Sequence, residues 1–305
     1  MEIIFLLAEL IPCLLIGYLL GRFKENLSLT ISRPLISYGI PISLMGILLN
    51  SGLELPLIES AALALVAIGI SMTILNRLPG IKNLITNRTL QLGSSFGNTG
   101  YFGIPVSLAL LPNRALIYSI GFDLGATLVI WSIGPILLTD PAKVLNSNRY
   151  WKNFIKAIFS SPAVKGLIGA LIVHSSAWKE QITALLWIPS RVVILLALVI
   201  VGMRLSWLKK ANLSRIKIQI ISIKNALIMK LVGLPVIMLI ISSVIRLPNV
   251  MREALVLQSA APTAISVLLI SQAASRDEEE ATSLVVLSTI IALISIPAWL
   301  MILRL

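Results

Sequence analysis

Two apolar stretches of the chain each carry a proline among small and polar residues, and these residues are the best placed for chemistry. They are residues 93–109 (GSSFGNTGYFGIPVSLA) and 258–271 (QSAAPTAISVLLIS). Proline removes an amide hydrogen and clashes with the preceding helical turn. Inside a bilayer, each backbone group left unpaired costs several kcal/mol unless protein, water or a ligand binds it. Interrupted helices at matching places in two halves of a chain point to a transporter's binding site.

In the first stretch, Pro105 is expected to interrupt the helix and to free carbonyls near position 101. The helix resuming after Pro105 would present free amides and a partial positive charge, which suit a carboxylate. Glycines recur here every three or four residues, so close helix packing is the alternative explanation for them. The candidate binding residues are Asn98, Thr99, Gly100, Gly103 and Pro105.

The second stretch repeats this arrangement around Pro262. Its candidate binding residues are Gln258, Ser259, Pro262, Thr263 and Ser266. Two such helix ends meeting near the bilayer midplane would offer amide donors to an anion and free carbonyls to a cation.

Ionisable residues inside apolar spans are costly and are functional candidates. Asp123 is the first candidate for coupling to a proton or sodium ion, and Lys230 is the candidate counter-ion; a structural partner role for Asp123 and snorkelling for Lys230 remain open. The acidic run at 277–280 is interpreted as a solvated loop or helix start. With only Cys13 and His174, neither a disulfide, a transition-metal site nor a cofactor is expected.

The elements that must position these residues are transmembrane helices. The chain has 57% apolar and only 12% charged residues, and its mean hydropathy is +0.96. Spans of about 20 apolar residues are expected for helices that cross a bilayer. Reading the chain this way predicts an all-α polytopic membrane protein with ten spans. They are residues 2–21, 34–52, 56–75, 89–111, 115–138, 157–176, 183–206, 221–245, 253–273 and 281–303.

The net charge of +12 follows the topology and does not indicate a nucleic-acid partner. Lysine and arginine concentrate in the odd-numbered connections between spans, which places those connections in the cytoplasm and both termini outside. Anionic lipid is the nearest partner for this charge. The first span lacks a basic segment before it and a cleavage pattern after it, so it is interpreted as a retained helix. The expected location is the plasma (inner) membrane.

Five spans precede the basic connection at 139–156 and five follow it. The expected organisation is a first five-helix repeat at 1–138, a cytoplasmic connecting loop at 139–156 and a second repeat at 157–305. An odd number of spans per half makes the repeats inverted. Pro105 and Pro262 correspond in spans four and nine, and Pro41 and Pro189 in spans two and seven.

With these residues in view, the chain resembles the auxin efflux carrier family, which includes the plant PIN-formed proteins and bacterial relatives. The similar stretches are GNTGYFGIP at 97–105, IPSRVVILLALVIVGMRLS at 188–206, APTAIS at 261–266 and VVLSTIIALISIP at 285–297. The resemblance implies ten helices in two inverted repeats, similar to bile-acid sodium symporters, with helices four and nine crossing at their proline breaks beside the substrate. It maps Asn98, Gly100, Gly103 and Pro105 onto one crossover motif, and Pro262 with Thr263 onto the other.

The sequence therefore favours a secondary transporter of a small organic anion, such as an auxin-like carboxylate, working by elevator-type alternating access. The alternatives are a sodium- or proton-driven symporter of a bile-acid-like or other amphipathic anion, and a channel. An intramembrane enzyme would need a paired nucleophile and base or a metal cluster, and the lone histidine and the absence of Cys or Asp pairs argue against one. No GxxxxGK[ST] loop occurs, which excludes ATP-driven transport by this chain alone. The sequence leaves open a homodimer and the identity of the coupling ion, if there is one.

Overall fold

The computed structural model describes residues 2–23, 34–51, 55–138, 162–206 and 213–305, together with positions 152, 155 and 159. Within these residues the regular structure is helical, and extended backbone pairs at one isolated bridge. The expectation of an all-α protein is therefore confirmed. The expected connecting loop at 139–156 lies outside the described residues apart from positions 152 and 155.

The elements before that loop include two π-helical turns and one 3-10 turn. They are α1 (Glu2–Phe23), the π turn η1 (Leu35–Gly39), α3 (Ile40–Ser51), α4 (Leu55–Arg77), α5 (Pro79–Lys82), α6 (Arg88–Ser95), the π turn η2 (Thr99–Gly103), α7 (Ile104–Leu110), the 3-10 turn η3 (Asn113–Ala115) and α8 (Leu116–Leu138).

The elements after the loop include a third π turn. They are α11 (Pro162–His174), α12 (Lys179–Ser206), α13 (Leu213–Ile228), the π turn η5 (Met229–Gly233), α14 (Leu234–Val244), α15 (Asn249–Ala260), α16 (Ile265–Ala274) and α17 (Glu278–Leu303).

Four helical segments are long and apolar enough to cross a membrane. They are Leu55–Arg77, Leu116–Leu138, Ile220–Val244 and Glu278–Leu303. They coincide with four of the expected spans, so the chain is a multi-pass membrane protein. The total of ten spans and the inverted repeat remain predictions. The acidic run is a helix start, because Asp277 is the N-cap of α17.

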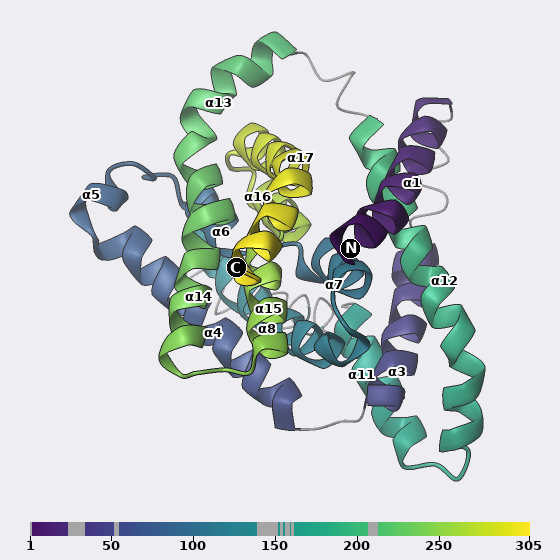
Figure 1. The fold of residues 1–305 in the computed structure, drawn as a ribbon. Helices are drawn as coiled ribbons and strands as arrows, with labels where there is room; N and C mark the ends of the chain where they lie inside the picture. Colours follow the sequence, from purple (N-terminus) through teal and green to yellow (C-terminus); the bar gives the residue numbers. More distant parts are fainter. Residues whose placement is uncertain are drawn as a thin grey trace.

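The helices form two groups, which Figure 1 shows side by side. One group contains α1, α3, α11 and α12, in which α12 packs on α1 and α3, and α3 packs on α11. The other contains α4, α6, α8 and α13 to α17. In Figure 1, α7 lies between the groups, and it contacts α1 and α12 on one side and α8 and α15 on the other. The segment that holds the first candidate residues therefore lies where the groups meet.

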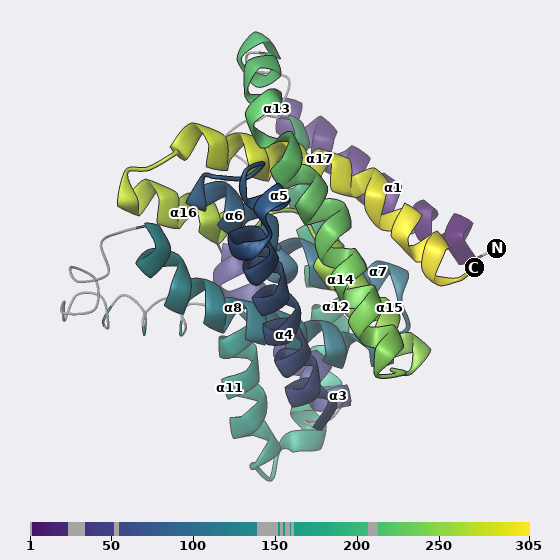
Figure 2. The same cartoon turned by 90° about the vertical axis from the view of Figure 1, so that its left-hand side faces the viewer.

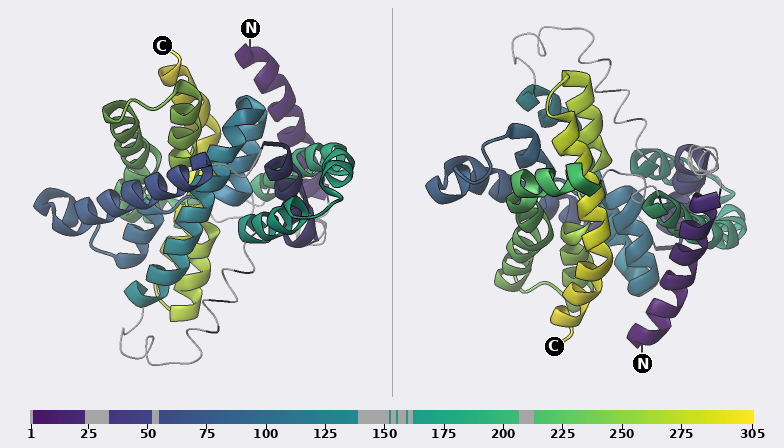
Figure 3. Two further views of the ribbon diagram at one scale, coloured as in Figure 1. Left: turned by 90° about the horizontal axis from the view of Figure 1, so that it is seen from below. Right: turned by 90° about the horizontal axis from the view of Figure 1, so that it is seen from above.

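The start of α1 and the end of α17 lie at the same end of the molecule (Figures 2 and 3). This placement agrees with an even number of membrane crossings. The side of the membrane on which both ends lie remains a prediction from the loop charges.

Each of the three π turns ends at a glycine that is followed by an aliphatic residue and a proline. The three sequences are Gly39-Ile40-Pro41, Gly103-Ile104-Pro105 and Gly233-Leu234-Pro235. Proline cannot donate to the carbonyl one turn earlier and clashes with it, and a locally widened turn relieves that clash. At the third turn, Pro235 has no amide hydrogen to donate to the Leu231 carbonyl one helical turn earlier. The indole Nε1–H of Trp299 donates to this carbonyl instead, at 2.9 Å.

Within the group of α4, α6, α8 and α13 to α17, helices α4 and α8 approach each other closely at a pair of glycines. A Cβ on Gly121 would lie 2.3 Å from the Leu57 carbonyl oxygen, and one on Gly125 would lie 2.5 Å from the Ala61 carbonyl oxygen. Small residues at this spacing let two membrane helices approach until their backbones touch. This contact fixes α8, and with it Asp123, which lies between the two glycines.

We predict that Gly125→Ala destabilises the protein by about 1–3 kcal/mol, because backbone atoms of α4 cannot yield as a side chain would. The matched control is Gly69→Ala on α4, where a Cβ would meet no atom within 4 Å. Thermal unfolding of the purified protein in detergent measures both. Equal melting temperatures for the two variants would contradict this account of the α4–α8 contact.

Candidate functional site

The structure brings the two interrupted stretches into direct contact. Helix α6 ends at Ser95 and η2 begins at Thr99, while α15 ends at Ala260 and α16 begins at Ile265. The extended backbone between them pairs at an antiparallel bridge between Gly97 and Thr263. On either side of the bridge, the Asn98 amide donates to the Pro262 carbonyl at 2.6 Å, and the Ala264 amide donates to the Phe96 carbonyl at 3.0 Å. We call residues 96–98 and 261–264 together the crossover.

The two prolines have different positions relative to these interruptions. Pro262 lies inside the second one, as expected, but Pro105 lies in the first turn of α7, after a helix that already begins at Thr99. The expected interruption at Pro105 is therefore wrong, because the π turn η2 absorbs the proline without ending the helix. The repeated glycines also do not share one helix face, since Gly93 is in α6, Gly97 is extended and Gly103 is in η2.

The second interruption diverts amides that would continue α15. A regular helix would pair Thr263 N–H with the Ser259 carbonyl. Instead, Thr263 N–H donates to Ser288 Oγ on α17 at 2.9 Å. The Gln258 carbonyl, which proline at position 262 cannot bind, accepts from the Ala261 amide at 3.2 Å. The chain thus replaces lost helical bonds with bonds from neighbouring segments.

The first interruption is satisfied in the same way, partly by the second. The Gly93 carbonyl accepts from the Thr263 hydroxyl at 2.9 Å. The Asn98 carbonyl accepts from the amides of Phe102 and Gly103, at 3.1 and 3.0 Å, which starts η2. Each half of the crossover therefore supplies donors that the other half requires.

A carboxylate lies at the start of η2. Asp123 on α8 is 4% exposed, and the Thr99 hydroxyl donates to its Oδ1 at 2.5 Å. A Cβ on Gly100 would lie 3.0 and 3.2 Å from the two Asp123 oxygens, so the carboxylate lies close against this glycine and would have to shift if the residue were larger. Negative charge at a helix N-terminus is favourable. The protein's own carboxylate thus lies at the helix start that follows the first interruption, six residues before the helix end at Pro105 for which a substrate anion was expected.

An ammonium lies at the end of α15. Lys230 in η5 is fully buried, and its Nζ donates to the Ser259 carbonyl at 2.6 Å. A cation is favourable at a helix C-terminus because the unpaired carbonyls there carry a partial negative charge. Snorkelling of Lys230 toward the interface is therefore wrong, and its side chain lies at the crossover.

A buried amide links α15 to α7. Gln258 is fully buried, its Nε2 donates to Ser107 Oγ at 3.0 Å, and no hydrogen-bond partner of its Oε1 is found among the described residues. A Cβ on Gly103 would lie 2.2 Å from that oxygen. A larger residue at position 103 would therefore displace the Gln258 side chain from this position.

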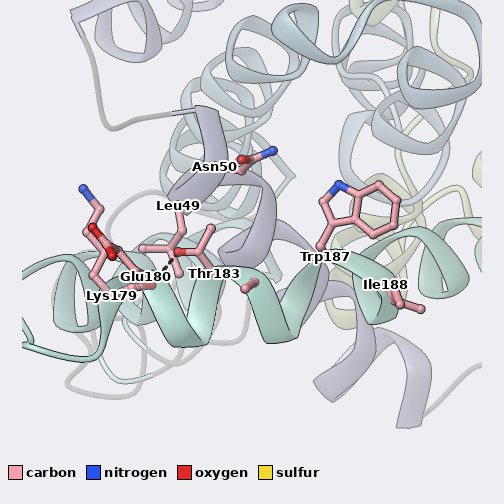
Figure 4. A pocket seen from close by; sticks show the side chains of 8 residues that line it. Leu49, Asn50, Lys179, Glu180, Thr183, Trp187 and Ile188 are labelled. Carbon is pink, nitrogen blue, oxygen red and sulfur yellow. Dashed lines mark hydrogen bonds between the residues drawn. The ribbon is translucent and has the colours of Figure 1, made fainter.

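Of the remaining candidates, Pro105 is buried in α7, and Ser266 is half-buried in the first turn of α16. A surface pocket of about 540 Å³ lies elsewhere, between the end of α3 and the start of α12 (Figure 4). Its lining residues are Leu49, Asn50, Lys179, Glu180, Thr183, Ala184, Trp187 and Ile188, and none of them is a candidate from the sequence. In the part of the chain that the structure describes, no three His, Cys, Asp or Glu side chains lie close enough to hold a metal.

Sequence reasoning missed two serines that complete the crossover. Ser107 accepts from Gln258, and Ser288 accepts from the Thr263 amide. Both are hydroxyls in apolar helices, where a hydroxyl usually bonds to its own helix, and Ser288 lies beside a second hydroxyl, that of Thr289. The sequence therefore carries no local signal that separates them from their neighbours.

We predict that Ser288→Ala destabilises the protein by about 1–3 kcal/mol, because it leaves the buried Thr263 amide without an acceptor. Thr289→Ala is the matched control, since the Thr289 hydroxyl donates only within its own helix, to the Val285 carbonyl. Melting temperatures of both variants test this. A loss in Thr289→Ala as large as that in Ser288→Ala would show that the Thr263 bond is not the cause.

Comparison with known proteins identifies the family of this chain. A family model described as a membrane transport protein matches residues 3–300. A relative from Methanothermobacter thermautotrophicus, described as an uncharacterized transporter, is 23% identical over 292 residues, which cover 93% of each chain. The chain therefore belongs to this family of membrane transport proteins, the family of the auxin efflux carriers that its sequence resembles.

Proposed function

We propose that this protein is a secondary transporter that moves a small organic anion across the plasma (inner) membrane by alternating access at the crossover. The observation that carries the proposal is the backbone pairing between residues 96–98 and 261–264, with a buried carboxylate at one helix end and a buried ammonium at another. Helix ends and freed backbone groups of this kind form the substrate and ion sites of secondary transporters.

The accessible side of the crossover indicates where the anion binds. Thr99, Gln258, Ser259 and Thr263 are buried, and their hydrogen bonds hold the backbone in place. Asn98 is half-buried, and its side chain does not cap η2. Its amide is the donor we assign to the substrate carboxylate, with the half-buried Ser266 as a second polar contact.

The arrangement of the helices supports an elevator-type movement. The group of α4, α6, α8 and α13 to α17 carries the crossover, and the group of α1, α3, α11 and α12 lies beside it (Figure 1). In the proposal, the group that carries the crossover moves against the group of α1, α3, α11 and α12, with α7 at the boundary between them. The ten-helix organisation, with inverted repeats at 1–138 and 157–305, is part of this proposal, as is the placement of both termini outside.

A thermal-shift screen of purified protein against small mono- and dicarboxylates identifies the anion, and counterflow in proteoliposomes then measures its transport. We predict that Asn98→Ala abolishes both the thermal shift and the counterflow without changing the melting temperature of the free protein. Asn76→Ala is the control, since the exposed Asn76 amide donates only to its own helix. Counterflow by Asn98→Ala at the wild-type rate would overturn the assignment of this residue.

If transport is driven by a sodium or proton gradient, Asp123 is the residue that we assign to binding of the coupling ion. We predict that Asp123→Asn retains counterflow, which needs no driving gradient, but loses acceleration by an imposed sodium or proton gradient. The carboxamide still fits beside Thr99 but carries no charge to bind an ion. Gradient-driven uptake by Asp123→Asn equal to that of wild type would make Asp123 purely structural.

A further inference from the structure

Lys230 supports the transport proposal by its place at a helix end, but that proposal assigns its ammonium no contact with the substrate or the coupling ion. It is fully buried and comes from η5, outside the two segments that form the crossover. A charge inside a membrane protein is expensive and persists only where it is paired or hydrogen-bonded. The surroundings of its ammonium therefore show what kind of site it occupies.

Those surroundings are backbone carbonyls at the end of α15. The Ser259 carbonyl oxygen is 2.6 Å from Lys230 Nζ. This carbonyl is available because its helical partner, the Thr263 amide, donates to Ser288 instead. The α15 helix ends here, so its partial negative charge is directed at the ammonium.

The other side of the ammonium is formed by the crossover. A Cβ on Gly97 would lie 3.2 Å from Lys230 Nζ and 3.4 Å from the Ala261 carbonyl oxygen, so both atoms border the same small space. Because position 97 is glycine, the ammonium can lie directly against the extended backbone. The Ser259 carbonyl contacts the ammonium directly, and the Ala261 carbonyl borders the space at Gly97. A free carbonyl at a broken helix end is a typical ligand of a monovalent cation.

We propose that the Lys230 ammonium is a tethered cation that occupies a monovalent-cation site at the end of α15, with the Ser259 carbonyl as its direct ligand. In the wild-type protein this site is permanently filled, and no external cation binds there. Removing the side chain beyond Cβ opens the site to a free cation of the same chemistry. This proposal concerns the folded crossover and does not depend on which anion is carried.

The test is chemical rescue of Lys230→Ala by methylammonium, which replaces the end of the missing side chain. We expect the variant to melt at a lower temperature than wild type in tetramethylammonium chloride, a salt whose cation is too large for the space. Replacing this salt by methylammonium chloride at equal ionic strength should reverse at least half of the decrease in melting temperature. The melting temperature should rise with methylammonium concentration, as expected for a ligand that binds the native state.

Lys230→Met is the matched control, because it removes the same charge but fills the space with an apolar side chain. We expect it to melt at a lower temperature than wild type and to show no difference between the two salts. Wild type should also show no difference. The proposal is overturned if methylammonium does not raise the melting temperature of Lys230→Ala. It is also overturned if methylammonium raises the melting temperature of Lys230→Met or of wild type as much as that of Lys230→Ala.

A Lys230→Ala variant that does not survive extraction in tetramethylammonium is tested by extraction in methylammonium. Recovery of monodisperse protein only in methylammonium supports the proposal. Failure of extraction in both salts, with Lys230→Met recovered normally in either, overturns it.

Discussion

The interruption of two helices within apolar segments imposes the constraint on which the rest of this structure depends. Backbone amides and carbonyls that leave a helix in hydrocarbon need other partners. Here the two interruptions satisfy each other, through Asn98 with Pro262 and Ala264 with Phe96, and through the Thr263 hydroxyl with Gly93. Because each interruption needs the other for its hydrogen bonds, two segments that are distant in sequence form one structural unit.

The charges at the crossover follow from the same constraint. An N-terminus and a C-terminus exposed by the interruptions carry partial charges of opposite sign. Asp123 lies at the first and Lys230 at the second, and glycines at positions 97 and 100 let both side chains reach the backbone. The crossover is thus flanked by an anion and a cation of the protein itself. An incoming anion therefore meets a site whose helix ends are already neutralised, which favours recognition by polar groups such as the Asn98 amide.

Composition and apolar runs were sufficient to predict the helical class, the membrane location and the two stretches that meet. Proline spacing located the second interruption but not the first, because a π turn accommodates Pro105. The Gly-aliphatic-Pro pattern, shared by three π turns in the described residues, was the signal that could have corrected this. The roles of Ser107 and Ser288 could not be predicted, since their partners are far away in sequence and only the folded crossover brings them together.

The central claim is that the crossover faces the two sides of the membrane in turn. Cys13 is the chain's single cysteine, so Cys13→Ser provides a background in which Asn98→Cys is the only thiol. Labelling of that thiol by a membrane-impermeant reagent, in right-side-out and in inside-out vesicles, measures its access directly. Alternating access predicts labelling of this thiol from both sides, because the substrate-free protein exposes the crossover to each side in turn. Labelling from one side alone under every condition would contradict the account.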